Sequence, residues 1–452
     1  MRMSRTDSRA DLLKTMLALS LPTVLEEVLA TLLQYVDTAM VGRLGEQATA
    51  SVSITTTITW LVGSIAAAVG TAVLALISQA VGSEDRVLCE KLSQQALLLA
   101  VVCGFICGGV SIVLSPFIPV WMGAEPAIRR QASLYFFIIS LPMLFRAANT
   151  ILGAAIRATQ NTAGPMLISM AANFLNVGLN YLLIYRCALG VTGAAIATAV
   201  SYTVSGTLMF LLYRRTPLLR WKWWDLAPDL PQLRRCAKIG LPVLGTSMTS
   251  CLGYVVFAGL VSDMGTTVFA AHSIAVTAET IFYIPGYGLR TATSALVGAS
   301  LGERNREKLL EVSKLSVALT MGMMCLSGVL LYRIAGPLMA LFSPVEAVVG
   351  LGAEMLRLVA FSEPFFGLMI VLEGIFYGLG RTRYAFCIET ASMWGVRLLL
   401  TFLCVKVWAL DLRAVWLCMI ADNVCKATLF AAPFFTKRSR DRLLNSLFLK
   451  EK

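Results

Sequence analysis

The chain has 452 residues, of which 57% are hydrophobic and only 14% are charged, and its formal net charge is +12. Soluble domains are typically about 45–50% apolar and about 25% charged. The composition therefore excludes an ordinary soluble protein and indicates an integral membrane protein.

Apolar windows of about 20 residues, the length that crosses a bilayer core, predict an all-α membrane protein with twelve transmembrane helices. The runs are too long and too uniform for the alternating pattern of a transmembrane β-barrel. We expect the spans near residues 15–39, 52–79, 92–117, 133–156, 165–186, 190–213, 238–262, 272–299, 313–335, 354–379, 386–410 and 413–436.

The basic residues are unevenly distributed between the two sides of these spans. The two tails and the even-numbered connections carry 26 of the 38 Lys and Arg residues, and the odd-numbered connections carry 7. This is the positive-inside pattern, so we expect both termini in the cytoplasm and no nucleic-acid partner. Trp221, Trp223 and Trp224, in the basic segment 213–238, are expected at the membrane interface.

The sequence repeats itself at an offset of 220 residues. Leu21-Pro22 falls on Leu241-Pro242, Gly45 on Gly265 and Gly82 on Gly302. An even number of spans in each copy gives both copies the same orientation, with a pseudo-two-fold axis along the membrane normal. We therefore predict an N-lobe of six helices at 1–213, a basic linker at 214–237 and a C-lobe of six helices at 238–452. Such doubling favours a secondary transporter over a channel.

Short motifs mark both halves. The first half contains LPTVLEEVLATLLQYVDTAMVGRLG (21–45), QAVGSEDR (79–86) and IRATQNTAGP (156–165), and the second contains IGLPVLG (239–245), ALVGASLGERNREK (295–308) and GLGRT (378–382). In this order and spacing they resemble the multidrug and toxic compound extrusion (MATE) family, in particular a bacterial branch. The resemblance implies a V-shaped pair of six-helix bundles that exports organic cations or amphiphilic compounds in exchange for H⁺ or Na⁺.

Asp37 lies inside the first apolar span. A charged side chain there is costly and normally faces the interior of the bundle. Because desolvation favours the neutral form of a carboxyl group, such a residue can take up a proton on one side of the membrane and release it on the other. The alternative is that Asp37 is solvated at the outer interface. The resemblance implies a coupling carboxylate in this VDT segment.

Span five carries three asparagines on one helix face: Asn173, Asn176 and Asn180. They either form hydrogen bonds between helices or contribute to a cation site. The resemblance implies a sodium site made of Asp37, Asn176, Asn180 and Thr198, in which Asn180 replaces a second carboxylate. One carboxylate fits either H⁺ or a weaker Na⁺ site, and the sequence leaves both open.

Glu279, in span eight, is a second candidate for ion coupling, and Glu26 or Glu27 competes with it. We expect Glu279 to be neutralised by Arg290, by Arg397 or by a proton. Asp422 and Lys426, spaced i, i+4 in span twelve, are expected to form an ion pair. The helix breakers Pro142, Pro285 and Pro364 lie in or beside spans, and Pro285-Gly286 is the bend we consider most favourable.

A wall rich in methionine and aromatic side chains can adapt to varied substrates, although packing alone explains any one of these residues. The residues that we expect to line the substrate cavity are Gln34, Tyr35, Met40, Asn149, Met170, Asn173, Tyr283, Arg290, Trp394 and Arg397.

A rival interpretation is a flippase or exporter of lipid-linked oligosaccharide or of another anionic, lipid-like substrate. Arg146, Arg290, Arg357 and Arg397 would then hold a pyrophosphate. An enzyme is not expected: the sequence has no P-loop, its eleven cysteines form no CxxC pair, and its only histidine is His272. We expect a monomer in the bacterial inner membrane, without a cofactor other than the coupling ion.

Overall fold

The structure of the protein, a computed structural model, describes residues 9–220, 227–435, 441–442 and 445. Throughout this part of the chain the regular structure is helical. Ten helices are long and apolar enough to cross a membrane, and two bent pairs of shorter helices raise the number to twelve if each pair is one span. The predicted fold class and all twelve predicted spans are confirmed. Trp221, Trp223 and Trp224 lie outside the described residues.

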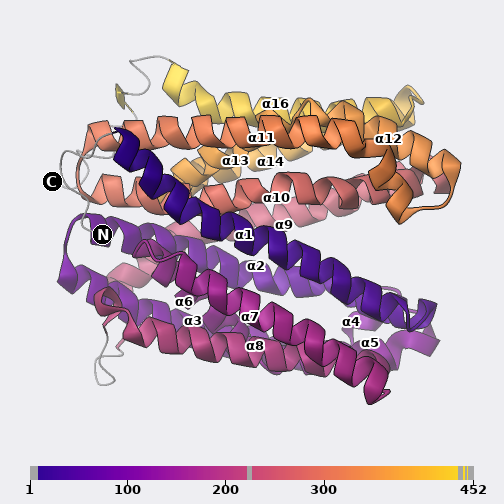
Figure 1. Ribbon diagram of the computed structural model, residues 1–452, viewed down its shortest axis with the longest axis horizontal. Helices are drawn as coiled ribbons and strands as arrows, with labels where there is room; N and C mark the ends of the chain where they lie inside the picture. The colour runs from indigo at the N-terminus through magenta and orange to yellow at the C-terminus, as the bar shows by residue number, and fades with distance from the viewer. Residues whose placement is uncertain (1–8, 221–226, 436–440, 443–444, 446–452) are drawn as a thin grey trace. The chain divides into compact units, whose positions relative to one another are not determined.

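The first half of the chain forms a bundle in which α6 packs against α2, α3 and α8, while α7 packs against α8. Figure 1 shows α6, α7 and α8 in magenta side by side. The helices of this half are α1 (Arg9–Gly42), α2 (Glu46–Gly82), α3 (Arg86–Leu114), α4 (Ile118–Trp121), α5 (Pro126–Ser140), α6 (Met143–Ala158), α7 (Ala163–Asn180), a π-helical turn (Tyr181–Arg186), and α8 (Gly190–Arg215).

The second half repeats this order after a short 3₁₀ turn at Pro217–Leu219. Helix α10 packs against α11 and α13, and α16 packs against α13. The helices are α9 (Leu230–Ser262), α10 (Thr266–Gly302), α11 (Arg306–Phe342), α12 (Glu346–Ala360), α13 (Glu363–Gly378), α14 (Thr382–Ser392), α15 (Leu399–Phe402) and α16 (Leu412–Phe435), with π-helical turns at Met393–Leu398 and Leu403–Val407.

The element bounds confirm the internal repeat. Helices α2, α5 and α6 recur as α10, α12 and α13 with every bound shifted by 220 residues. Gly45 and Gly265, which precede α2 and α10, both have φ of 108°, a conformation that L side chains rarely adopt and that glycine adopts freely. The turn before each of these helices therefore needs glycine at the same place in both halves.

Two of the predicted helix breakers lie at sharp bends. The α5–α6 pair is bent by 50° and the α12–α13 pair by 56°. Pro142 lies in the first break, where it precedes α6, and Pro364 follows the second break, in the first turn of α13. Helix α10, in contrast, continues through Pro285 without interruption. The bend that we favoured at Pro285-Gly286 therefore does not break the helix, because the preceding and following turns keep helical geometry.

By packing, the chain divides into Leu25–Leu244 and a second unit made of Met1–Val24 with Gly245–Lys452. Within the second unit, the Thr23 hydroxyl donates a hydrogen bond to the carbonyl oxygen of Gly288 at 2.8 Å. Within the first unit, Gly240 at the start of α9 lies against the backbone of Ala68 in α2. Each unit thus includes the first turns of a helix whose remainder belongs to the other unit. The lobe boundaries at 213 and 238 stay a prediction.

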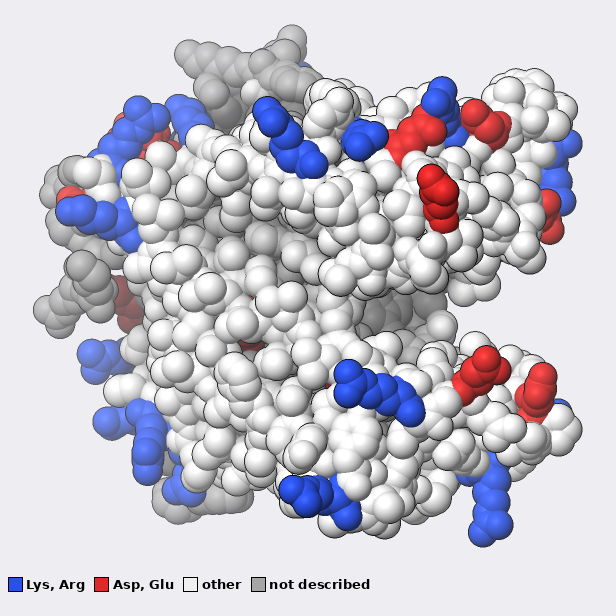
Figure 2. All heavy atoms as spheres, turned by 45° about the vertical axis from the view of Figure 1, so that its right-hand side comes forward, with Lys and Arg blue, Asp and Glu red and all other residues white. Residues whose placement is uncertain are grey.

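The surface matches a membrane environment. Most of the face in Figure 2 is uncharged, and α1 exposes a row of leucines that includes Leu17, Leu21 and Leu25. In the second half, buried aromatic side chains enclose His272, whose ring meets those of Phe257 and Trp416 edge to face. Apolar surface that would be unfavourable in water is expected where lipid is the solvent.

Candidate ion-coupling site

All four residues of the predicted cation site come together in the first half. The Asn180 side-chain amide donates hydrogen bonds to an Asp37 carboxylate oxygen and, at 3.3 Å, to the Asn176 side-chain oxygen. The Asn176 amide in turn donates to the Thr198 hydroxyl at 3.3 Å. A continuous chain of polar side chains therefore runs from α1 through α7 to α8.

Helix periodicity and a local change of helix type position these groups. Asn176 and Asn180 lie one turn apart on α7, and the π-helical turn begins at Tyr181, directly after Asn180. The wider turn places the Tyr185 hydroxyl 2.9 Å from the Met40 carbonyl oxygen, to which it donates a hydrogen bond. π-Helical turns occur frequently at functional sites. Here the turn adds a second link between α1 and the end of span five.

The site offers oxygen atoms rather than nitrogen or sulfur ligands. Asn180 is fully buried, and its side-chain oxygen has no hydrogen-bond partner in the described part of the chain. A buried polar atom without a partner costs free energy unless a ligand or water satisfies it. The Asp37 carboxylate, the two amide oxygens and the Thr198 hydroxyl are the donor set that hard cations such as Na⁺ accept. The residues therefore fit either a proton on Asp37 or a sodium ion.

Sequence reasoning missed the residues that surround Asp37 from spans four and six. The Tyr135 side chain lies within electrostatic range of the Asp37 carboxylate, of Arg146 and of Tyr202. The Arg146 guanidinium lies 5.3 Å from the centre of the Tyr202 ring and donates a hydrogen bond to the Thr59 carbonyl oxygen at 3.3 Å. No sequence pattern links these positions, because they belong to different helices and meet only through tertiary packing.

The buried charges of the second half form pairs with one another. The Arg290 guanidinium lies 2.7 Å from a Glu373 carboxylate oxygen, and the Tyr377 hydroxyl donates to the other oxygen at 2.5 Å. The expectation that Arg290 neutralises Glu279 is therefore wrong. Arg290 and Glu279 are three turns apart on α10, whereas Glu373 approaches Arg290 from α13.

A second buried cluster joins spans eleven and twelve. Arg397 lies 2.9 Å from Asp422, and Lys426 lies 2.8 Å from Glu389 and 3.2 Å from Asp422. The predicted pairing of Asp422 with Lys426 is confirmed. Glu389 was missed, although an acid eight residues before Arg397 in an apolar span was a signal for it. Two acids and two bases leave this cluster with no net charge.

Glu279 and Glu363 are the buried acids of the second half for which no ion pair occurs among the described residues. Glu279 is 8% exposed and Glu363 is 1% exposed, and neither carboxylate oxygen of Glu363 has a hydrogen-bond partner there. Glu279 belongs to a different packing unit from Asp37, so the two candidate acids are not one site. The role of Glu279 stays a prediction.

The residues expected to line the substrate cavity form two sets, one in each unit. Tyr283 packs against the rings of Tyr287 and Phe366, and Trp394 is 38% exposed. The side-chain oxygen of Asn149 is buried without a described partner. The first set is Gln34, Tyr35, Met40, Asn149, Met170 and Asn173, and the second is Tyr283, Arg290, Trp394 and Arg397.

Comparison with known proteins agrees with this arrangement. The MatE family model matches residues 22–182 and again residues 242–403, so the second match begins 220 residues after the first. The probable multidrug resistance protein NorM of Thermotoga maritima is 25% identical over 421 residues, which cover 92% of this chain and 90% of that protein. The human multidrug and toxin extrusion protein 1 is 24% identical over 423 residues, 91% of this chain and 73% of that protein.

Solved structures share the fold. A crystal structure of MATE in the straight conformation superimposes with a TM-score of 0.90 at 20% sequence identity, covering 98% of this chain and 99% of that chain. A MOP superfamily transporter from Pyrococcus furiosus gives a TM-score of 0.89 at 21% identity with the same coverage. At these identities the likeness concerns the architecture of the helices.

Proposed function

Since the chain belongs to the MatE family of membrane transporters, we propose that it exports organic cations or amphiphilic compounds in exchange for H⁺ or Na⁺. Relatives with which it aligns over about nine-tenths of its length bear the names of multidrug resistance or extrusion proteins. The membrane is the bacterial inner membrane, and the positive-inside pattern of the sequence supports cytoplasmic termini.

The observation that carries the proposal is the hydrogen-bonded chain from Asp37 to Thr198. Its only ionisable member is Asp37, and no Lys or Arg forms an ion pair with it among the described residues. An antiporter needs such a group, because a carboxylate already neutralised by a fixed cation has little tendency to bind and release a mobile one. Asp37 is therefore the group that binds the coupling ion.

Ion binding changes the strength of the link between α1 and α7. A hydrogen bond to a charged acceptor contributes about 1.5–3 kcal/mol, and one between neutral groups about 0.5–1.5 kcal/mol. Protonation of Asp37 thus weakens its bond from Asn180 by about 1 kcal/mol. A sodium ion would instead draw the unpartnered Asn180 oxygen toward the carboxylate. Either event biases α1 between two arrangements, which is what alternating access requires.

The paired arginines favour this function over the transport of an anionic lipid-linked sugar. A site for pyrophosphate needs arginine side chains that are free to form two hydrogen bonds with the phosphate oxygens. Arg290 and Arg397 already pair with Glu373 and Asp422, and Arg157 forms a bidentate pair with Glu26 at 2.7 and 2.8 Å.

Transport in proteoliposomes tests the proposal. Purified protein is reconstituted, a fluorescent organic cation such as ethidium is supplied, and a proton or a sodium gradient is imposed separately. We expect one of the two gradients, directed opposite to the ethidium flux, to drive accumulation. If neither gradient affects ethidium and a labelled polyprenyl-pyrophosphate sugar crosses the membrane instead, the anionic alternative is correct.

A further inference from the structure

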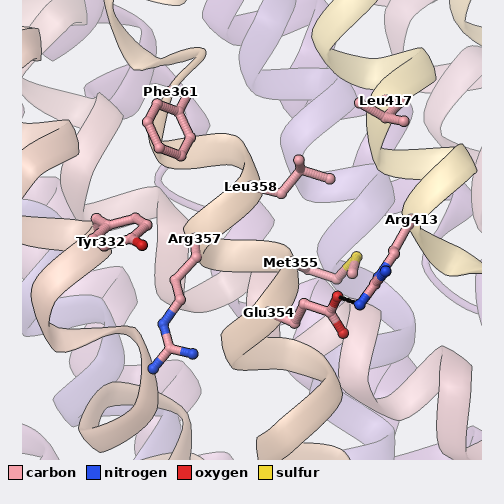
Figure 3. Close-up of a pocket in the computed structure, with 8 residues that line it drawn as sticks. All are labelled: Tyr332, Glu354, Met355, Arg357, Leu358, Phe361, Arg413 and Leu417. Atoms are coloured by element: carbon pink, nitrogen blue, oxygen red, sulfur yellow. Dashed lines mark ion pairs between the residues drawn. The ribbon is translucent and has the colours of Figure 1, made fainter.

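A groove lies where α11, α12 and α16 meet in the second half of the chain. Its volume is about 350 Å³. Figure 3 shows Tyr332 from α11, Leu358 from α12, Phe361 just after α12, and Leu417 from α16 around it. None of these residues belongs to the hydrogen-bonded chain of Asp37 or to the buried ion clusters.

The walls of the groove are apolar and open to the surroundings. Phe361 is 71% exposed, Leu417 is 53% exposed and Tyr332 is 44% exposed, and the rings of Tyr332 and Phe361 meet edge to face at 5.6 Å. Because α11 and α16 are membrane spans and α12 is half of one, the natural environment of exposed apolar groups on these helices is lipid.

The charges at the groove do not cancel. Glu354 and Arg413 form an ion pair, which Figure 3 marks by a dashed line, whereas Arg357 points away from that pair. Arg357 has no acidic partner within ion-pair distance in the described part of the chain. The groove therefore carries one net positive charge, on an exposed guanidinium in the last turn of α12.

The position of Arg357 along its helix makes that charge costly without a ligand. Eleven residues separate it from Glu346, the first residue of α12, which is about 16 Å along the helix axis. The headgroup layer on each side of a bilayer is only roughly 5–8 Å thick. The backbone of Arg357 therefore lies below the headgroups, and its side chain must reach toward an anion at their level.

We propose that this groove binds one anionic phospholipid, whose phosphate is held by the Arg357 guanidinium and whose acyl chain lies along Leu358, Phe361 and Leu417. A guanidinium matches a phosphate with two parallel hydrogen bonds, and the apolar walls match the chain. The positive charge repels an organic cation, so the groove is separate from the proposed transport site. The lipid would join three helices beside the α12–α13 bend and thereby influence how readily that bend changes.

Native mass spectrometry of the purified full-length protein, titrated with phosphatidylglycerol or phosphatidylcholine, tests this binding. A basic side chain near the membrane surface contributes about 1 kcal/mol to attraction of an anionic lipid, which corresponds to about a five-fold change in affinity. We therefore expect Arg357→Gln to weaken the tightest phosphatidylglycerol site about five-fold and to leave phosphatidylcholine unchanged.

Matched variants separate the site from general effects. Arg333→Gln removes an exposed arginine next to Tyr332 in the sequence that does not line the groove, and it should leave the tightest site within two-fold of wild type. Leu358→Trp keeps the charge but fills the groove, so it should abolish that site. Equal melting temperatures in detergent without added lipid show that the variants fold.

Several outcomes would overturn the proposal. One is wild-type phosphatidylglycerol binding in both Arg357→Gln and Leu358→Trp, and another is equal binding of the two lipids by the wild-type protein. Displacement of the lipid by glycerol 3-phosphate at the same concentration would mean that the acyl chain makes no contact. A dimer that disappears in the variants would mean that a second copy of the chain, rather than a lipid, occupies the groove. If Arg357→Gln fails to fold, Leu358→Trp and the comparison of the two lipids still decide.

Discussion

Replacing Asp37 by Asn isolates its ionisation from its packing. The two side chains have nearly the same shape, and the new side-chain oxygen can still accept the hydrogen bond from Asn180. The exchange of a charged for a neutral acceptor costs about 1 kcal/mol, so the variant should fold. It removes the one group in this chain of side chains that can bind a proton or supply a negative charge to Na⁺.

The expected loss follows from the energy of the coupling ion. One elementary charge moving across 100 mV releases about 2.3 kcal/mol, which supports about a 50-fold concentration ratio of a neutral substrate at about 1.36 kcal/mol per tenfold. In Asp37→Asn, the ratio reached in proteoliposomes should fall to about one, while binding of the substrate is retained.

The measurement is the steady-state accumulation of a fluorescent substrate under an imposed ion gradient. Asp263→Asn is the matched control, because this carboxylate is 49% exposed and pairs with Lys406 at 2.8 Å, away from the Asn180 chain. The control should behave as wild type. Wild-type accumulation by Asp37→Asn would refute the assignment of the coupling role to this carboxyl group.

Three further predictions address the ion, the buried pair and the helix packing. Asn180→Asp adds a second carboxylate at the site and should increase the dependence of transport on Na⁺ in an ion-replacement assay; unchanged dependence would remove Asn180 from the site. Arg290→Gln leaves the Glu373 charge buried without its partner and should cost about 3 kcal/mol in thermal or denaturant unfolding, most of which should return when Glu373→Gln is added; equal stability of all three proteins would contradict the pairing. Gly104→Ala places a Cβ 2.6 Å from a backbone atom of α6 and should destabilise by about 1–3 kcal/mol, whereas Gly109→Ala on the same helix meets nothing within 4 Å and should not.

The architecture was predictable because membrane physics writes it into local sequence. Each span needs about 20 apolar residues, and the two halves keep their spacing, so the offset from Gly45 to Gly265 placed whole helices correctly. The grouping of Asp37 with Asn176 and Asn180 was also foreseen, because i, i+4 spacing fixes which asparagines share a face and the family resemblance related that face to span one.

The partners of individual charges were not predictable in the same way. Arg290 was matched with an acid on its own helix, but Glu373 reaches it from α13, whose approach depends on the 56° bend before that helix. The π-helical turns were missed as well, since no local sequence signal for them exists in Tyr181–Arg186 or Met393–Leu398. Both kinds of feature depend on how helices pack after they form.

The extra π-helical turn explains a difference between the two halves that bears on coupling. Left-handed residues recur at an offset of 220 up to Gln160 and Gly380, but Ala188 recurs at Ala409, one residue later. A π-helical turn accommodates one added residue, and the turn at Met393–Leu398, which has no counterpart in the first half, contains Arg397.

That insertion places a fixed cation where the second half would otherwise repeat the ion site. Asp37 corresponds to Phe257 at the 220-residue offset, and the Arg397 guanidinium lies 5.9 Å from the centre of the Phe257 ring and 5.7 Å from that of Tyr254. Its charge is balanced by Asp422 at 2.9 Å. A permanently charged arginine can neither be exchanged nor released. Of these two corresponding positions, the one at Asp37 alone can therefore exchange a cation, and this asymmetry favours one coupling ion per cycle, bound at Asp37.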